Sequence, residues 1–460
     1  MGKISGIIYL ICQALKMKSF PNALTILVVF IFITGLLTYI IPKGRYKRAI
    51  NPKTQQEVVV PGSYEVIQAE HLTFFNILTS IPRGMLKGGE VMILIFLVGG
   101  CLYLVEQTGA LKDGIVSFTS AVQGKESVAL WGVAGLFTIG GATEGLEEEI
   151  VPLIPVLLVF VRSLGYQPMV AVAVSYGSAV LGAAFSPINP FGAVIAQKTA
   201  EVPFLTNSLF RVGVFIVAFI VWMLLLIRYA NQNRIEKDKT HQSYKQRLQQ
   251  SHKVILSLLA FAFILLIVGM LRWNWGFNEI SAEFFSFGIV IGIVGGFGLD
   301  GTLIRYAEGL KQMTFAALIG GIAYTIPLLL QEGYIMDTII NSLFTPLQYV
   351  PPMLSALGMM GSQALLHLIL PSYSGQAVLT MPILAPLSDL IGISRDACIL
   401  AYQYGAILMN MVSPTNGALM AIISMAGIQY DTWIKFIVKR LAIILAIGAV
   451  AILVALVMGI

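Results

Sequence analysis

The chain has 460 residues, of which 57% are hydrophobic and only 11% are charged, and its formal net charge is +6. Soluble domains carry about 25% charged residues, so this composition excludes an aqueous globular enzyme. A membrane helix needs about 20 apolar residues, which leaves room for roughly ten spans and no sizeable soluble domain. The composition therefore predicts an all-α polytopic membrane protein.

The basic residues, the cysteines and the histidines exclude further classes. The basic residues lie in short loops, where they set the orientation of a membrane protein, so the positive charge does not indicate nucleic-acid binding. The three cysteines are far apart and the four histidines form no pair at metal-ligand spacing. Neither a disulfide framework nor a metal site built on thiolates or paired histidines is therefore predicted.

The predicted elements begin with an interfacial helix over residues 1–20, which leads into the first apolar run. Two regions, 126–200 and 351–426, are apolar but are interrupted by glycine, proline and polar residues. Such interruptions are tolerated at membrane depth only where they face a cavity enclosed by protein, and they are typical of discontinuous helices. The uninterrupted apolar runs are 22–41, 89–107, 205–227, 254–271, 284–299, 313–330 and 436–460.

The two interrupted regions contain a repeat. The Ser-Pro-x-Asn motif at 186–189 recurs at 413–416, and Pro155 recurs as Pro382, each at an offset of 227 residues. Two unrelated kinked helices would not share this offset, so we interpret the pattern as an internal duplication.

The duplication divides the chain into two repeats and a linking part. The basic loop 228–253 is assigned to the cytoplasm, which places the N-terminus there as well and makes the two hairpins open to opposite faces. The repeats are therefore expected to be inverted. The first predicted repeat covers 1–227 and contains a re-entrant hairpin at 126–164 and a broken helix at 168–200. A basic loop and linking span follow over 228–283. The second repeat covers 284–460 and contains a hairpin at 352–391 and a broken helix at 396–426.

The turn of the first hairpin carries four carboxylates within six residues: Glu144, Glu147, Glu148 and Glu149. A carboxylate at membrane depth costs several kcal/mol unless it is paired or hydrated, and by default it marks a functional site. The alternative is a solvated loop at the membrane surface, in which Glu144 and Glu147 are exposed while the other two point inward. The turn of the second hairpin, 371–376, is neutral but rich in hydroxyl and amide groups, which suits a substrate with two unlike ends or a substrate with a coupling cation.

Each Ser-Pro-x-Asn motif is expected to unwind its helix in mid-membrane, because proline removes a helix hydrogen bond. The freed carbonyls can coordinate Na⁺ or an ammonium group. The N-terminus of the following half-helix presents N–H groups to a carboxylate. The alternative is a pair of proline kinks without a ligand, which does not explain why serine and asparagine recur with the proline.

Two further residues lie inside predicted apolar segments. Arg211 is six residues into a predicted span, where it either balances the acidic turn or directs its guanidinium outward to the membrane surface, and we favour the second. His367 lies alone in an arm of the second hairpin. It is expected to be a hydrogen-bonded packing residue rather than a proton relay.

These segments resemble the YfcC-like family of the ion transporter superfamily, which is related to the anaerobic four-carbon dicarboxylate carriers. The resemblance rests on EEEIVPLIPVLLVF and GAAFSPINPFGAVIAQ in the first half, and on PSYSGQAVLTMPILAPLSDLIGISRD and VSPTNGALMAI in the second. It implies an inverted-repeat fold, often dimeric, in which a transport domain moves against a scaffold. The substrate-binding residues implied by these motifs are Glu148, Glu149, Ser186, Asn189, Ser374, Gln376, Ser413 and Asn416, with a possible Na⁺ site near Thr143, Asn189, Thr415 and Asn416.

The resemblance implies secondary transport across a bacterial-type cytoplasmic membrane, with Na⁺ or H⁺ as a possible coupling ion and no other cofactor. The leading hypothesis is alternating-access transport of a small amino acid, with arginine/ornithine-type exchange as a specific form. The turn carboxylates would hold the amine or guanidinium. The alternative is a Na⁺- or H⁺-coupled carrier of four-carbon dicarboxylates. A channel or an intramembrane enzyme is disfavoured. The sequence has neither a zinc-binding His-Glu pair nor a nucleotide-binding glycine loop with lysine, which also argues against ATP-driven transport in this chain.

Overall fold

The fold is that of a helical, multi-pass membrane protein, seen in a computed structural model. The expected interfacial helix over 1–20 and most of the basic loop lie outside the described residues. In the described part, seven helical segments are long and apolar enough to cross a membrane. The structure describes residues 21–50, 57–111, 113–114, 117, 125–235, 249–273 and 275–460.

The seven segments coincide with most of the predicted apolar runs. One difference is at 313–330, where the apolar run is the second half of a longer helical segment, Gly298–Glu332, that consists of two consecutive helices. The long helix α12 (Gln250–Trp273) corresponds to the predicted linking span. The seven segments are α2 (Ala23–Ile40), α4 (Gly89–Gln107), α8 to α10 (Pro168–Thr199), α11 (Ser208–Gln232), α13 (Phe277–Val294), α14 with α15 (Gly298–Glu332) and α21 (Tyr430–Met458).

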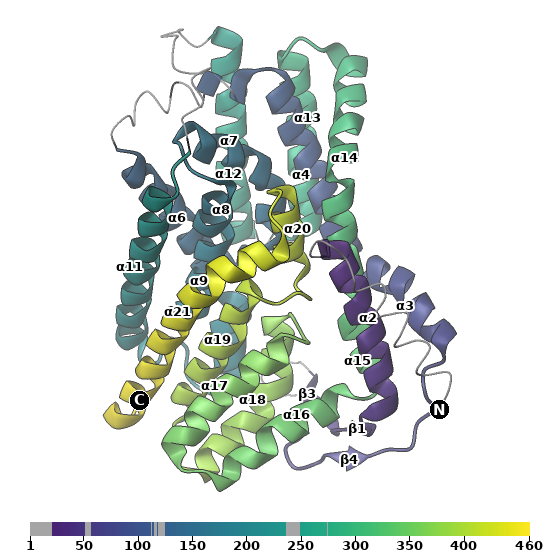
Figure 1. Ribbon diagram of the computed structural model, residues 1–460, viewed down its shortest axis with the longest axis vertical. Coiled ribbons are helices and arrows are strands. Elements are labelled where there is room, and N and C mark those ends of the chain that lie inside the picture. Colours follow the sequence, from purple (N-terminus) through teal and green to yellow (C-terminus); the bar gives the residue numbers. More distant parts are fainter. Residues whose placement is uncertain are drawn as a thin grey trace.

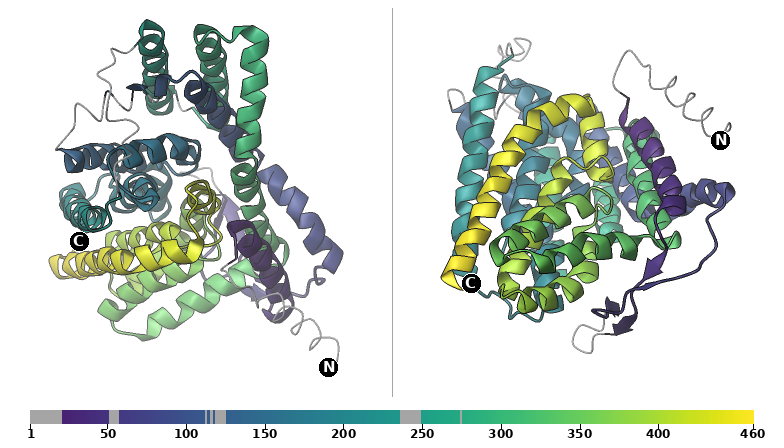
Figure 2. Two further views of the ribbon diagram at one scale, coloured as in Figure 1. Left: turned by 45° about the horizontal axis from the view of Figure 1, so that its top comes forward. Right: turned by 60° about the horizontal axis from the view of Figure 1, so that its bottom comes forward.

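One group of helices, which we call the flanking bundle, occupies the top and the right of the molecule in Figure 1. It contains α2, α3 (Phe74–Lys87), α4, and the helices from α12 to α15, where α14 is Gly298–Ala323 and α15 is Thr325–Glu332. A hydrophobic cluster that includes Leu94, Ile255 and Phe284 joins α4, α12 and α13. The left view of Figure 2 shows the α12–α14 part of this bundle set apart from the remaining helices.

The remaining helices form the hairpin bundle, which contains both predicted hairpins. The first hairpin consists of α6 (Glu126–Glu144), a 3₁₀ turn (Glu148–Leu153) and α7 (Ile154–Ser163), and the second consists of α17 (Pro352–His367) and α18 (Tyr373–Leu390). In Figure 1, α7 lies toward the upper end of the molecule while α17 and α18 lie toward the lower end. The helical hairpins are present where predicted, while their re-entrance into the membrane stays a prediction.

Both predicted broken helices are present in the hairpin bundle. In the first, α8 (Pro168–Val172), a π-helical turn (Ala173–Gly177) and α9 (Ser178–Phe185) end before Ser186, and helical structure resumes with a π turn (Pro190–Val194) and α10 (Ile195–Thr199). In the second, α19 (Arg395–Ala406) and a 3₁₀ turn (Ile407–Met411) are followed by α20 (Gly417–Met425). The interruptions fall at the two Ser-Pro-x-Asn motifs, where proline prevents continuation of the helix.

The first hairpin and the first broken helix pack closely. A Cβ atom at Gly182 of α9 would lie 2.1 Å from the carbonyl oxygen of Thr138 of α6, and one at Gly141 would lie 1.9 Å from the carbonyl oxygen of Ala179. Only glycine permits these helices to approach to backbone contact. The close approach places the acidic turn at the end of α6 beside the break at Ser186.

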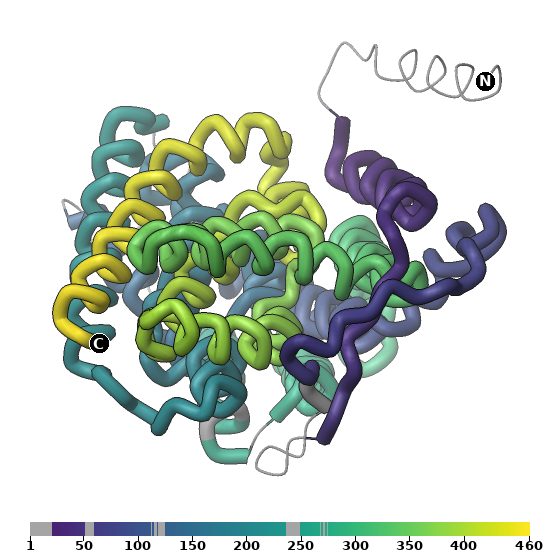
Figure 3. The backbone as a smooth tube through the Cα atoms, turned by 90° about the horizontal axis from the view of Figure 1, so that it is seen from below, coloured from purple at the N-terminus to yellow at the C-terminus, as the bar shows by residue number. Residues whose placement is uncertain are grey.

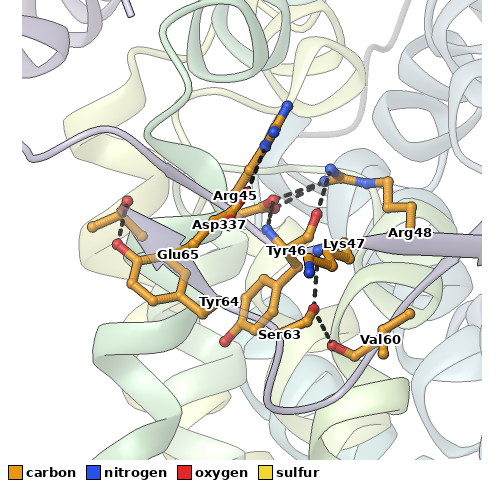
Figure 4. A network of polar contacts seen from close by, with 10 residues as sticks. Arg45, Tyr46, Lys47, Arg48, Val60, Ser63, Tyr64, Glu65 and Asp337 are labelled. Atoms are coloured by element: carbon orange, nitrogen blue, oxygen red, sulfur yellow. Dashed lines mark hydrogen bonds and ion pairs between the residues drawn. The ribbon is translucent and has the colours of Figure 1, made fainter. Parts of the chain in front are cut away.

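A small β-structured segment connects α2 to α3 and packs on the second half of the chain. Strand β1 (Gly44–Arg45) pairs with β4 (Glu65–Val66), and β2 (Arg48–Ile50) pairs with β3 (Glu57–Val59). Asp337 of α16 (Met336–Phe344) accepts a hydrogen bond from the Tyr46 amide (2.9 Å) and forms an ion pair with Arg48 (3.0 Å) (Figure 4). From below, this segment runs next to the second hairpin (Figure 3). Two basic residues of this segment therefore have structural partners, Arg45 with Glu65 and Arg48 with Asp337.

Candidate functional site

A cavity of about 460 Å³ lies where the two hairpin turns meet the second broken helix. Its volume is in the range of about 300–1,000 Å³ that is usual for small-molecule sites. One wall comes from the hairpin bundle and the other from α4, α13, α14 and α15 of the flanking bundle. The hairpin bundle contributes residues 144, 145, 147–149, 191, 371–374 and 415–418, and the flanking bundle contributes residues 90, 91, 275–277, 280, 320, 323, 324 and 327.

The lining of the cavity is strongly acidic. Five glutamates line it and, among the residues that the structure describes, no lysine or arginine does. Hydroxyl groups of Tyr324, Tyr373 and Thr415 complete the polar surface. A cavity lined by one sign of charge concentrates ligands of the opposite sign, so this site is suited to an ammonium or guanidinium group. The five glutamates are Glu90, Glu144, Glu147, Glu148 and Glu149.

The acidic turn directs its carboxylates to different places. Gly145 ends α6 in the left-handed region with φ +67°, which reverses the chain. The carboxylate of Glu149 accepts a hydrogen bond from the Glu147 amide (3.1 Å), so it folds back over the turn while remaining at the cavity surface. Glu148 is also half-buried at the cavity.

Glu147 is buried, at 5% exposure, so the alternative of a solvated surface loop does not hold for this residue. Its carboxylate accepts hydrogen bonds from the side-chain amides of Asn410 (2.5 Å) and Asn416 (3.4 Å). Burial of a carboxylate is tolerated when such donors replace water. No sequence pattern indicates this pairing, because Asn410 has no counterpart at the 227-residue offset. Glu144, by contrast, is partly exposed.

The first Ser-Pro-x-Asn motif holds the broken helix to the first hairpin. Ser186 Oγ donates to the carbonyl of Ala142 (2.7 Å), and Asn189 Nδ2 donates to the carbonyl of Gly141 (2.8 Å). Asn189 Oδ1 accepts from the Gly192 amide (2.6 Å) and so caps the next helical segment. Ser186 and Asn189 are buried and stand behind the cavity lining, whereas Phe191 belongs to the lining.

The second motif is held in the same way. Thr415 Oγ1 donates to the carbonyl of Leu368 in the second hairpin (2.8 Å), and Ser413 Oγ lies 2.7 Å from Thr415 Oγ1. Asn416 Oδ1 accepts from the Leu419 amide (2.8 Å) and caps α20. Thr415 and Asn416 line the cavity, but Ser413 does not. The two residues of the predicted Na⁺ group in the first half, Thr143 and Asn189, are outside this lining.

The second hairpin contributes one predicted residue to the cavity and one to its support. Ser374 lines the cavity. Gln376 is fully buried behind it, where its amide nitrogen donates to the Gln363 carbonyl (2.8 Å) and its oxygen lies 2.9 Å from His367 Nδ1. His367 is hydrogen-bonded and buried, as predicted, and its Nε2 lies 2.5 Å from Asn410 Oδ1.

Arg211 neither balances the acidic turn nor extends outward, so both expectations for it are wrong. Its guanidinium is 1% exposed and forms a 2.6 Å ion pair with Asp396 of α19. It also donates to Gln403 Oε1 (2.8 Å), whose amide nitrogen in turn donates to the Ser186 carbonyl (3.0 Å). The sequence does not reveal this pair, because the two residues are separated by 185 positions.

We expect the Asn189→Ala variant to be less stable than the parent. Its free energy of unfolding should fall by about 1–2 kcal/mol, and it should unfold at a lower temperature. The change removes a helix cap and leaves the buried Gly141 carbonyl without its donor. Thermal unfolding of the purified protein in detergent measures the effect. Asn22→Ala is the matched control, since it removes only an exposed cap on α2. An Asn189→Ala variant as stable as Asn22→Ala would contradict the supporting role of Asn189.

Comparison with known proteins places this chain in a family. The family model described as "C4-dicarboxylate anaerobic carrier" matches residues 20–457. The chain is 28% identical to the "Putative basic amino acid antiporter YfcC" of Escherichia coli and to an uncharacterised protein of Haemophilus influenzae, and each match covers 95% of this chain and 97% of the relative. Among solved structures, the YdaH transporter of Alcanivorax borkumensis aligns with a TM-score of 0.44 and 16% identity over 95% of this chain and 99% of that one. MtrF of Neisseria gonorrhoeae aligns with a TM-score of 0.42 and 17% identity over 95% of each chain.

Proposed function

We propose that this chain, which belongs to the C4-dicarboxylate anaerobic carrier family, is a secondary active transporter that moves a small cationic amino acid by exchange. The chain is a multi-pass membrane transporter by its family and its apolar helices. The substrate and the exchange are the proposal. The name of the relative from Escherichia coli, a putative basic amino acid antiporter, agrees with it.

The acidic lining of the cavity is the observation that carries the proposal. Five glutamates face a cavity of about 460 Å³ whose described lining has no basic residue. Glu148 and Glu149 would hold the ammonium or guanidinium group of the substrate. Gly417 and Ala418, in the first turn of α20, line the same cavity. Because helix N-termini bind anions, they would receive the α-carboxylate.

The alternative substrate is a four-carbon dicarboxylate, which the description of the family favours. A dicarboxylate in this cavity would meet like charges on the glutamates, and such contacts are repulsive. It would therefore have to enter together with Na⁺ or H⁺. A cationic amino acid needs no such compensation, so the charge of the lining favours the amino acid.

The position of the cavity between the two bundles suggests how the substrate crosses. The hairpin bundle carries the acidic turn and the first turn of α20, while the flanking bundle supplies only one wall. Displacement of the hairpin bundle along that wall would carry the substrate from one face of the membrane to the other. We place the protein in the cytoplasmic membrane with its N-terminus inside.

Uptake into proteoliposomes tests the proposed substrate. We expect saturable uptake of labelled arginine or ornithine into vesicles preloaded with the unlabelled partner, and little uptake into empty vesicles. Labelled succinate is the matched probe for the alternative, measured with and without gradients of Na⁺ and H⁺. Saturable uptake of succinate that basic amino acids do not inhibit would overturn the proposal.

A further inference from the structure

A line of buried side chains joins the two hairpins behind the cavity. It runs from Glu147 through Asn410 and His367 to Gln376, and each member is at most 5% exposed. His367 is the last residue of α17, at the helix end that favours a positive charge. We propose that His367 is held as the doubly protonated, positively charged imidazolium and that Glu147 is its counter-ion across the Asn410 amide.

The orientation of Asn410 follows from the cap of α20. Asn416 must present Oδ1 to the Leu419 amide (2.8 Å), so its Nδ2 faces Asn410 (2.8 Å). The atom of Asn410 that faces this donor is therefore its oxygen, and its nitrogen donates to Glu147 (2.5 Å). The same oxygen lies 2.5 Å from His367 Nε2. Because a carbonyl oxygen can only accept, Nε2 must carry a hydrogen.

The orientation of Gln376 follows from a backbone group. Its amide nitrogen donates to the Gln363 carbonyl (2.8 Å), which has no hydrogen to give. The remaining atom, Oε1, lies 2.9 Å from His367 Nδ1. This oxygen is also only an acceptor, so Nδ1 must carry a hydrogen too. A neutral imidazole has one N–H group, and a ring that donates from both nitrogens is an imidazolium.

Burial disfavours a charged imidazole, so the proposed imidazolium needs a negative group close by. Glu147 faces His367 through a single amide group, and Glu148 and Glu149 stand in the same turn. The hydroxyl of Tyr176 donates to the Asn410 carbonyl (3.1 Å) and so fixes the backbone of that residue. The hydrogen bonds of His367 in the described structure involve no lysine or arginine. The assignment holds for any substrate that the cavity carries.

Nitrogen NMR of the full-length protein tests this charge. The chain has four histidines, and His71 and His252 lie outside the buried chain, so the H71Q/H241Q/H252Q variant keeps His367 as its single histidine. With ¹⁵N-labelled histidine, we expect two protonated ring nitrogens at about pH 8, where an ordinary histidine is neutral. A single neutral tautomer at this pH would overturn the proposal. This variant leaves all four residues of the buried line, Glu147, Asn410, His367 and Gln376, unaltered.

Removal of the counter-ion tests the pairing. In the same background, E147Q is expected to convert the His367 signal at about pH 8 from imidazolium to neutral imidazole. E144Q is the matched control, since it removes the same charge three positions away and leaves the contact between Glu147 and Asn410 in place. In E144Q the His367 signal should stay that of the imidazolium. An imidazolium signal that persists in folded E147Q would show that Glu147 is not the counter-ion. If E147Q fails to fold, the result for the parent decides the charge of His367.

Discussion

We expect the Glu149→Gln variant to lose transport by about a hundredfold while keeping its fold and thermal stability. Glutamine preserves the shape of the side chain and still accepts the hydrogen bond from the Glu147 amide. What it removes is a negative charge at the cavity surface, opposite the cationic part of the substrate. Truncation of one member of a charge pair in a binding site costs about 2–5 kcal/mol, and each 1.4 kcal/mol is about tenfold in affinity.

The parent and Glu149→Gln are compared by their initial rates of arginine or ornithine exchange in proteoliposomes that contain equal amounts of inserted protein. Glu65→Gln is the matched control: it removes one negative charge from strand β4, where Glu65 forms an exposed ion pair with Arg45 (3.1 Å). Such exposed pairs contribute about 0–1 kcal/mol, so this variant should transport at the parental rate. Parental kinetics in Glu149→Gln would move the binding site away from the acidic turn.

The Asp396→Asn variant should be severely destabilised, by about 3–5 kcal/mol, because it leaves the buried guanidinium of Arg211 without its counter-ion. We expect the thermal midpoint in detergent to fall by roughly 5 °C or more. Asp389→Asn is the matched control, since Asp389 forms a partly exposed ion pair of similar length (2.7 Å) with Arg395 in the same region. Its loss should cost less than about 1 kcal/mol.

A double variant separates the loss of the pair from the burial of an unpaired charge. Replacement of a buried ion pair by apolar residues of similar volume is often neutral, so Arg211→Leu/Asp396→Leu should recover most of the stability that Asp396→Asn loses. Equal destabilisation by Asp396→Asn and Asp389→Asn would show that the pair does not hold the two halves of the chain together.

The sequence predicted those parts of the fold that depend on local chemistry. Proline at 187 and 414 breaks a helix wherever the helix lies, so both interruptions could be located from the motif alone. The sequence also singled out the acidic turn, the turn at 371–376 and the motif at 413–416, and residues of all three line one cavity.

What the sequence could not predict depends on pairs between distant segments. Asn410 and Gln363 have no matching residue at the repeat offset. Nothing near them in sequence indicates that Asn410 hydrogen-bonds to Glu147 or that Gln363 hydrogen-bonds to Gln376. The same applies to Asp396, which is 185 positions from Arg211. The motif serines and asparagines were expected to offer free ligands. The fold instead uses Ser186 and Asn189 to satisfy backbone groups of the first hairpin and of the break itself, because unpaired backbone groups are costly away from water.

The hydrogen bonds from the motif residues to the hairpin carbonyls limit how this protein can open. If a hairpin tip swung away to release the substrate, the carbonyls of Ala142, Gly141 and Leu368 would lose their side-chain donors inside the protein. Each such loss costs about 1–3 kcal/mol. Rotation or sliding of the whole hairpin bundle as one body leaves all of these hydrogen bonds intact. A gate built from one hairpin alone is therefore the energetically expensive route, and crosslinks between a hairpin and its own broken helix should leave exchange intact.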